Sequence, residues 1–237
     1  MRLFLLPNPF FLKLVMKNFI PFLMTVLVFW VGFNSTYAQG KLTAEELLAK
    51  SIEFHDPEHQ WNQFKSILNF DEQQPEKAVR KTQVHIDNST GYFKLNRGDE
   101  EISGMSLDSC FIIKGPVSCQ RAEMMRDYYL YLWGLPMKLK DANTPLQPTI
   151  NTETIKGIDY FTIQVNYPKD TWTFFLNKED YSLQAYRFIK PDKSGELIEL
   201  ADLVNVGAMR IPKTRKWFAL PENNYIATDI LMTSEGY

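Results

Sequence analysis

Two histidines and two carboxylates within five residues form the densest group of potentially catalytic side chains in the sequence. The segment His55-Asp56-Pro57-Glu58-His59 places its histidines four residues apart, a spacing that suits a metal ion only on one continuous helix. Pro57 interrupts such a helix, and Asp56 is a typical cap for the start of a new one. We therefore favour a structural role, with His55 at a helix end and His59 on an exposed turn, over a metal-binding or catalytic role.

Other signatures of hydrolases are missing from the sequence. It contains neither a GxSxG nor an HExxH pattern, and His85 is expected to point outward from a strand. Two cysteines nine residues apart with no nearby histidine do not make a zinc ligand set. We expect no metal, no cofactor and no catalytic residue, and we keep an envelope hydrolase using His55 and Asp56 as an alternative hypothesis.

Residues 128–141, YYLYLWGLPMKLKD, are unusually rich in aromatic and apolar side chains. An aromatic helix followed by an apolar loop is ordinarily part of a core. The other interpretation is a lid over an apolar cavity that accepts an acyl chain, because tyrosines pointing in different directions around a helix cannot all face one sheet. The candidate ligand-binding residues are Tyr128, Tyr129, Trp133, Leu135, Met137, Lys138 and Lys140. In this hypothesis the two lysines lie beside a phosphate or carboxylate head group.

The two cysteines, Cys110 and Cys119, flank the segment FIIKGPVS, in which Gly115-Pro116 marks a turn. A hairpin at this turn would bring the cysteines close enough to bridge. In an oxidising compartment an even number of cysteines favours a disulfide, and two buried free thiols are the alternative.

The N-terminus has the features of an export signal. Residues 19–33 are fifteen uncharged, mainly apolar residues, which is short for a membrane span but suits the core of a signal peptide. Lys17 precedes this core, and small residues follow it. We expect translation to start at Met16 and cleavage to fall between Ala38 and Gln39, with no cysteine near the cut for lipidation.

Charge and composition describe an ordinary globular domain. The 237 residues carry 26 basic and 28 acidic side chains, and 45% of them are hydrophobic. Residues 1–38 contain three basic side chains and no acidic ones, so residues 39–237 keep 23 basic against 28 acidic groups, a net charge of −5. Because nucleic-acid-binding proteins need a basic surface, we expect no nucleic-acid partner. Residues 39–237 suit one domain.

The secondary structure begins with helical signals. Thr43 and Glu46 form a capping box for a first helix that ends near His55. A second helix is predicted from Asp56 onward, with an apolar stripe that runs to Leu68. A third helix is predicted over residues 121–133, before the stop signal Gly-Leu-Pro.

Most of the remaining segments are typical of strands. Strands are predicted over residues 79–86, 92–95, 158–167, 171–176, 183–189, 197–206 and 215–220. Short strands joined by tight polar turns indicate an antiparallel meander rather than alternating βαβ units.

Several of these segments carry a resemblance to a known family. The pattern consists of HDP at residues 55–57 with Trp61 after it, residues 126–141 with the string LPMKLKD, and TDI at residues 228–230. IPK at 211–213 and RKW at 215–217 extend it. The chain resembles a family of uncharacterised secreted envelope proteins of Gram-negative bacteria, over essentially all of residues 40–232.

That family is similar in fold to periplasmic lipoprotein carriers and lipoprotein-sorting proteins, whose half-open barrels hold acyl chains beneath helices. The resemblance also implies a cysteine pair before the aromatic helix, which favours the disulfide. Ala227 stands where the pattern has glycine, which affects only a local turn. The family has no agreed activity, so the resemblance assigns no catalytic residue.

Together these observations predict an α+β fold in a single domain. We expect a strongly curved antiparallel sheet, a half-open barrel, with N-terminal helices and one inserted aromatic helix. The first functional hypothesis is a soluble periplasmic or secreted binding module for a lipid or a lipoprotein acyl chain, without a membrane span after signal cleavage. The alternatives are the envelope hydrolase and a non-catalytic scaffold that binds another envelope protein through its sheet edge.

Overall fold

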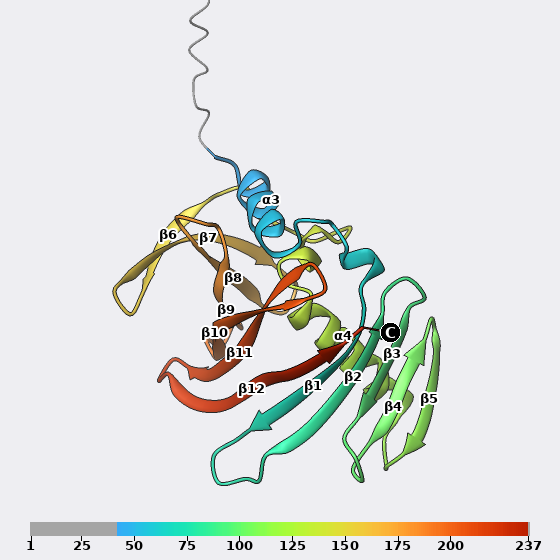
Figure 1. The fold of residues 1–237 in the computed structure, drawn as a ribbon. Helices are drawn as coiled ribbons and strands as arrows, with labels where there is room; N and C mark the ends of the chain where they lie inside the picture. Colours follow the sequence, from blue (N-terminus) through green and yellow to red (C-terminus); the bar gives the residue numbers. More distant parts are fainter. Residues whose placement is uncertain (1–41, 237) are drawn as a thin grey trace, which may run out of the picture. The chain divides into compact units, whose positions relative to one another are not determined.

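The computed structural model describes residues 42–236, which form one antiparallel sheet and two α-helices (Figure 1). The predicted signal segment, its start at Met16 and its cleavage after Ala38 lie outside the described residues. Between residues 42 and 236, no helix combines the length and the apolar character needed to cross a membrane.

The helical elements are α3 (Ala44–His55), η1 (Trp61–Gln63), α4 (Cys119–Trp133) and η2 (Met137–Lys140). The first five strands are β1 (Lys65–Gln73), β2 (Arg80–Asp87), β3 (Tyr92–Asn96), β4 (Ile102–Ser106) and β5 (Ser109–Lys114). The other seven follow α4: β6 (Asn151–Ile155), β7 (Ile158–Asn166), β8 (Thr171–Asn177), β9 (Leu183–Ile189), β10 (Gly195–Val206), β11 (Met209–Leu220) and β12 (Asn224–Glu235).

All twelve strands belong to one sheet, in the order β5-β4-β3-β2-β1-β12-β11-β10-β9-β8-β7-β6. Each strand pairs with its sequence neighbour, except that α4 separates β5 from β6 and that β12 pairs with β1. The predicted antiparallel meander is therefore confirmed. The sheet is not closed, because β5 and β6 do not pair with each other.

The sheet curves around helix α4 (Figure 1). Tyr129 of α4 packs near Phe93 of β3, with ring centroids 6.1 Å apart, and Tyr131 packs near Trp172 of β8 at 5.3 Å. Strands β3 and β8 are seven positions apart in the sheet, about 34 Å if the sheet were flat. A helix is only about 10–12 Å wide with its side chains, so the sheet must bend for one helix to touch both strands.

Local capping accounts for where both α-helices begin. Thr43 accepts the backbone N–H of Glu46, and the Glu46 carboxylate accepts the N–H of Thr43, which confirms the capping box of α3. Ser118 caps α4 by accepting the N–H of Arg121. Helix α4 ends at Gly134, as the stop signal predicts.

The predicted second helix after Asp56 is wrong. The Asp56 carboxylate accepts the backbone N–H groups of Gln60 and Trp61, and His59 has a φ of 52°, which breaks any helix. Only the short η1 turn follows, and the chain then enters β1, whose residues alternate between buried and less buried positions. The spacing of Trp61, Phe64 and Leu68 is compatible with the period of a helix and also with that of a short turn followed by a strand.

The predicted hairpin between the cysteines is also wrong, although the disulfide itself is present. Cys110 lies on β5, but Cys119 is the first residue of α4. Gly115 makes the expected turn with a φ of 93°, and the chain then enters the helix rather than a second strand. Strands β2, β3 and β7–β10 match the predicted segments, and β11 begins six residues before its predicted segment, whereas β1, β4, β6 and β12 are absent from the prediction.

Loss of the disulfide should destabilise the protein by about 2–3 kcal/mol, because the bridge joins cysteines nine positions apart in the sequence and so reduces the entropy of the unfolded chain. Cys119 is exposed and Cys110 is half-buried, so replacing both by alanine removes little packing. Urea unfolding of the double variant, with the chemically reduced native chain as a control, measures this loss. An unchanged free energy of unfolding would contradict the prediction.

Candidate functional site

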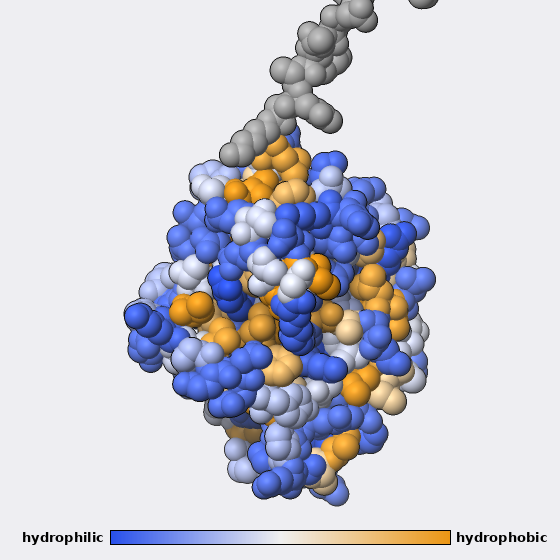
Figure 2. All heavy atoms as spheres, turned by 90° about the vertical axis from the view of Figure 1, so that its left-hand side faces the viewer, coloured by the Kyte–Doolittle hydropathy of each residue, from blue (hydrophilic) through white to orange (hydrophobic). Residues whose placement is uncertain are grey.

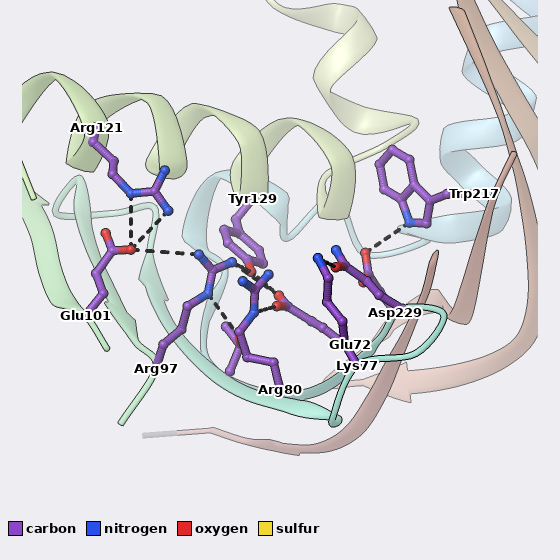
Figure 3. Close-up of polar contacts among 11 residues, drawn as sticks. Glu72, Lys77, Arg80, Arg97, Glu101, Arg121, Tyr129, Trp217 and Asp229 are labelled. Carbon is purple, nitrogen blue, oxygen red and sulfur yellow. Dashed lines mark hydrogen bonds and ion pairs between the residues drawn. The ribbon is translucent and has the colours of Figure 1, made fainter. Parts of the chain in front are cut away.

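A row of four charged residues crosses the middle of the sheet beneath α4, and Figure 3 shows three of them, Arg80, Glu72 and Asp229. Arg80 of β2 lies opposite Glu72 of β1, Glu72 lies opposite Asp229 of β12, and Asp229 lies opposite Arg215 of β11. Directly opposed residues on paired strands share one face of a sheet. The pairing register therefore brings two carboxylates together and places a guanidinium on each side of them.

Glu72 is the most heavily paired member of this row. Its Oε2 lies 2.5 Å from Nε of Arg80, and its Oε1 accepts the Tyr129 hydroxyl at 2.5 Å and lies 3.4 Å from Nη2 of Arg97. Burial alone would raise the pKa of Glu72, but the charges of Arg97 and Arg80 and the hydrogen bond from Tyr129 lower it. Glu72 is therefore a buried carboxylate that stays ionised.

The network continues away from the row through Arg97. This buried guanidinium donates to the hydroxyls of Tyr129 at 3.0 Å and Thr82 at 3.3 Å, and lies 3.8 Å from Oε2 of Glu101. Arg121 of α4 donates to the same Glu101 oxygen at 3.1 Å. The first half of α4 is thus tied to the sheet by charge-assisted hydrogen bonds.

Asp229 has fewer partners than Glu72. Its Oδ2 accepts the indole N–H of Trp217 at 3.0 Å. Burial, and then the negative charge of Glu72 beside it, raise the pKa of Asp229 to about 6, although Arg215 opposes this shift. Of the two adjacent carboxylates, Asp229 is therefore the one that takes up a proton first.

Arg215 fixes the end of α4 to the sheet. It is almost fully buried and donates to the backbone carbonyls of Leu132 at 3.1 Å and Pro212 at 2.8 Å. Its guanidinium carbon lies 3.4 Å from the centre of the Trp133 ring, in a cation–π contact. Trp133 in turn packs on Phe70 of β1, with ring centroids 4.3 Å apart.

A cavity of about 380 Å³ opens beside the charged row, and we call it the α4 cavity. The rings of Tyr128 and Trp217 stack in its wall, with centroids 6.3 Å apart and planes 15° from parallel. The three arginines Arg80, Arg97 and Arg121 also line it. Three segments that carry the family resemblance, containing Tyr128, Trp217 and Asp229, meet here.

The structure separates the seven residues expected to bind a ligand. Tyr128 lines the α4 cavity, but Tyr129 belongs to the buried ion network. Trp133, Leu135 and Met137 are buried in the main core. The space expected as an apolar cavity beneath α4 is thus filled by side chains of the helix and its following loop. Lys138 pairs with Asp141 and lines a different cavity, and Lys140 is exposed.

His55 and Asp56 both serve the fold. His55 is fully buried, with Nδ1 2.6 Å from the carbonyl of Arg210 and Nε2 accepting the N–H of Leu183 at 2.9 Å. Burial lowers the pKa of His55 to about 4, so the ring is neutral at physiological pH. Because backbone groups occupy both nitrogens, this histidine has no free atom for the acid–base chemistry of the hydrolase hypothesis.

A larger and more apolar cavity lies on the opposite face of the sheet, and we call it the outer groove. Its volume is about 610 Å³. It is lined by Ile155, Phe175, Ile189, Leu197, Leu220 and Pro221, with Lys156, Arg187 and Lys193 among its polar residues. Figure 2 views the molecule from the side of β6 and β7, where several separate hydrophobic patches lie among hydrophilic residues. The sequence segments expected to bind a ligand contribute nothing to this groove.

The outer groove exists because the β6–β7 end of the sheet curls. Lys156 in the β6–β7 turn forms an ion pair with Glu199 of β10 at 2.6 Å, although β8 and β9 lie between β7 and β10 in the sheet. Phe175 forms a buried part of the lining, and the guanidinium of Arg187 lies 5.2 Å from its ring centre. No local pattern marks this site, because its parts come from five strands and three turns.

Asp229 should make the stability of the native chain depend on pH. Because its pKa is raised from 3.8 to about 6 on folding, the folded state binds the proton more tightly than the unfolded state. The free energy of unfolding, compared with that of Asp229→Asn, should therefore increase as the pH falls from about 6 to about 4, by at most about 3 kcal/mol. Urea unfolding across this range measures the difference, with the exposed Asp108→Asn as the matched control. Parallel pH profiles for native chain and variant would contradict the assignment.

Comparisons with known proteins give a family and several similar folds. No curated protein matches the chain. A LolA superfamily protein of Nitrosomonas europaea has a TM-score of 0.47 at 12% identity, with 83% of this chain and 94% of that one covered. A putative outer membrane lipoprotein-sorting protein domain of Vibrio parahaemolyticus has a TM-score of 0.47 at 12% identity, with 81% of this chain and 90% of that one covered. A DUF1329 family protein of Desulfovibrio piger has a TM-score of 0.49 at 8% identity, with 81% of this chain and 92% of that one covered. The family model described as a family of unknown function, DUF6503, matches residues 112–233, over half of the chain, and the chain belongs to this family.

Proposed function

We propose that this protein is a non-catalytic binding module for an acyl-chain amphiphile, and that the acyl chain lies in the outer groove. The observation that carries the proposal is the apolar lining of a groove of about 610 Å³, which lies within the range of about 300–1,000 Å³ found for small-molecule sites. Burying an acyl chain contributes about 0.8 kcal/mol per methylene. Six buried methylenes therefore supply about 5 kcal/mol without any polar contact.

The polar residues around the groove favour an anionic head group. Lys156 is neutralised by Glu199, and Arg187 by Glu153 at 2.8 Å. Lys193 also lines the groove, and within residues 42–236 its ammonium group has no ion-pair partner. A carboxylate or phosphate head beside Lys193 would complete its charge pairing while the chain occupies the apolar floor.

Export of the chain is the second part of this proposal. The signal segment at residues 1–38 would leave a mature domain beginning at Gln39 in the periplasm or outside the cell. The disulfide between Cys110 and Cys119 supports this location, because such bonds persist in oxidising compartments. An envelope protein that carries an acyl ligand through water needs a groove of this kind to shield the chain.

Filling the groove should weaken acyl binding. Leu197 lies on the groove side of β10, so Leu197→Trp places a larger ring where the chain would lie. Isothermal titration with dodecanoate should show affinity at least tenfold weaker for this variant. The matched control is Leu203→Trp, on the same strand at an exposed position that does not line the groove, and it should bind within twofold of the native chain.

Chain length provides an independent check on the same site. Affinity for saturated carboxylates should rise about fourfold per methylene until the groove is full, because each buried methylene contributes about 0.8 kcal/mol. Equal affinity across the length series, or native binding by a folded Leu197→Trp variant, would contradict the proposed site.

A further inference from the structure

The charges lining the α4 cavity are divided between two ends. Arg80, Arg97 and Arg121 lie at one end, near β2, β3 and the start of α4. Asp229 and Glu196 line the cavity from β12 and β10. In Figure 3, Arg97 and Arg121 lie on one side of Glu72, and Asp229 and Trp217 lie on the other, where Lys77 is also drawn.

The guanidinium end has spare hydrogen-bond donors. Arg80 contacts Glu72 through Nε, and Arg121 contacts Glu101 through Nε and Nη2. Within residues 42–236, both Nη atoms of Arg80 and Nη1 of Arg121 lack a hydrogen-bond partner. The three guanidiniums at this end carry three positive charges, and only two carboxylates, Glu72 and Glu101, neutralise them. A bound oxyanion would supply the missing negative charge.

The carboxylate end has spare acceptors. Glu196 has no hydrogen-bond or ion-pair partner in the part of the chain that the structure describes, and Asp229 uses only Oδ2. Burial raises the pKa of both groups, which means that each carboxylate lacks sufficient compensation for its charge. The adjacent rings of Tyr128 and Trp217 offer π faces, which attract cations.

A ligand of a single charge fits this cavity poorly. Asp229 and Glu196 would repel a simple anion, and the three guanidiniums would repel a simple cation. Such repulsion between like charges lowers the affinity for either kind of ligand. A ligand with separated opposite charges satisfies both ends. Arg80 and Asp229 lie on strands two positions apart, about 10 Å between backbones, and the Arg80 side chain bends inward to Glu72.

We propose that the α4 cavity binds a phosphate ester that carries a primary ammonium group, the chemistry of a phosphoethanolamine. The phosphate oxygens accept hydrogen bonds from Arg80 and Arg121. The ammonium group lies between Glu196 and Asp229 and against the rings of Tyr128 and Trp217. A cavity of about 380 Å³ accommodates such a group.

This site is independent of the outer groove. The two cavities use opposite faces of β10, where Glu196 lines one and Leu197 lines the other. The same chemistry occurs in a soluble ester and in a lipid head group. The test therefore uses both forms of the ligand.

The binding test uses the full chain with its disulfide intact and three soluble probes. These are glycerophosphoethanolamine, its N-acetyl derivative, which lacks the positive charge, and glycerophosphoglycerol. Titration followed by NMR should give an affinity for glycerophosphoethanolamine at least tenfold above the other two. Similar affinity for all three probes would overturn the proposal, since it would show that the carboxylate end does not recognise the ammonium group.

Glu196→Gln is the decisive variant, because it removes the negative charge and replaces one acceptor oxygen with a donor NH2 group, while the size and shape of the side chain stay nearly unchanged. It should weaken binding of glycerophosphoethanolamine about tenfold and leave binding of glycerophosphoglycerol unchanged. Glu222→Gln, at an exposed position in the β11–β12 turn, is the matched control and should alter neither. Equal binding of glycerophosphoethanolamine by Glu196→Gln and the native chain would overturn the proposal.

Vesicles distinguish the source of the ligand. Phosphatidylethanolamine vesicles that capture the native chain but not Glu196→Gln, with weak binding of the soluble ester, assign the site to a lipid head group. Tight binding of the soluble ester, with no capture by vesicles, assigns it to a free metabolite. If neither form binds in a manner that depends on Glu196, the proposal is wrong. The Leu197→Trp variant should behave like the native chain in every arm, so failure of the acyl groove remains distinguishable.

Discussion

A carboxylate buried beneath a helix must be neutralised, and Glu72 imposes this requirement on the centre of the molecule. Arg80 of β2, Arg97 just after β3 and Tyr129 of α4 meet the requirement. The helix is consequently held in one position over the sheet, because the Tyr129 hydroxyl must reach Glu72 while accepting from Arg97. The price of this arrangement is a second carboxylate, Asp229, placed beside the first with only a partial set of partners. Because of this incomplete pairing, the α4 cavity is lined by a carboxylate that can accept a further hydrogen bond.

The curvature of the sheet connects the two cavities. Because the sheet bends around α4, its inner face is filled by the helix and by aromatic side chains such as Trp133. At the β6–β7 end the chain curls in the other sense, so that the turn containing Lys156 reaches Glu199 and encloses the outer groove. One continuous sheet thus carries the polar α4 cavity on its inner face and the apolar outer groove on its outer face. The two cavities are separated by the thickness of one strand, because Glu196 and Leu197 of β10 point to opposite faces.

Local signals in the sequence predicted the parts of the fold that local interactions determine. The capping box at Thr43, the stop at Gly134 and most of the strands from β7 to β11 follow from short patterns. The sequence predicts a helix after Asp56 because the apolar spacing fits the period of a helix as well as that of a strand, and only pairing with β2 and β12 selects the strand. The charged row could not be predicted, since Glu72 and Asp229 are far apart in the chain and meet only through the register of β1 with β12. The outer groove depends in the same way on long-range curvature. The aromatic segment was located correctly, but its density reflects a filled core and an ion network rather than a lid over an open cavity.

The proposed acyl site lies on the outer face of the sheet and not in the space beneath α4. The most direct measurement is an isotope-edited nuclear Overhauser experiment on the native chain with uniformly ¹³C-labelled dodecanoate. If the acyl chain lies in the outer groove, its methylenes should give cross-peaks to the methyl groups of Leu197 and Leu220, which line the groove. Cross-peaks to Leu132 and Met137, in the core contacted by α4 and the loop after it, would contradict it.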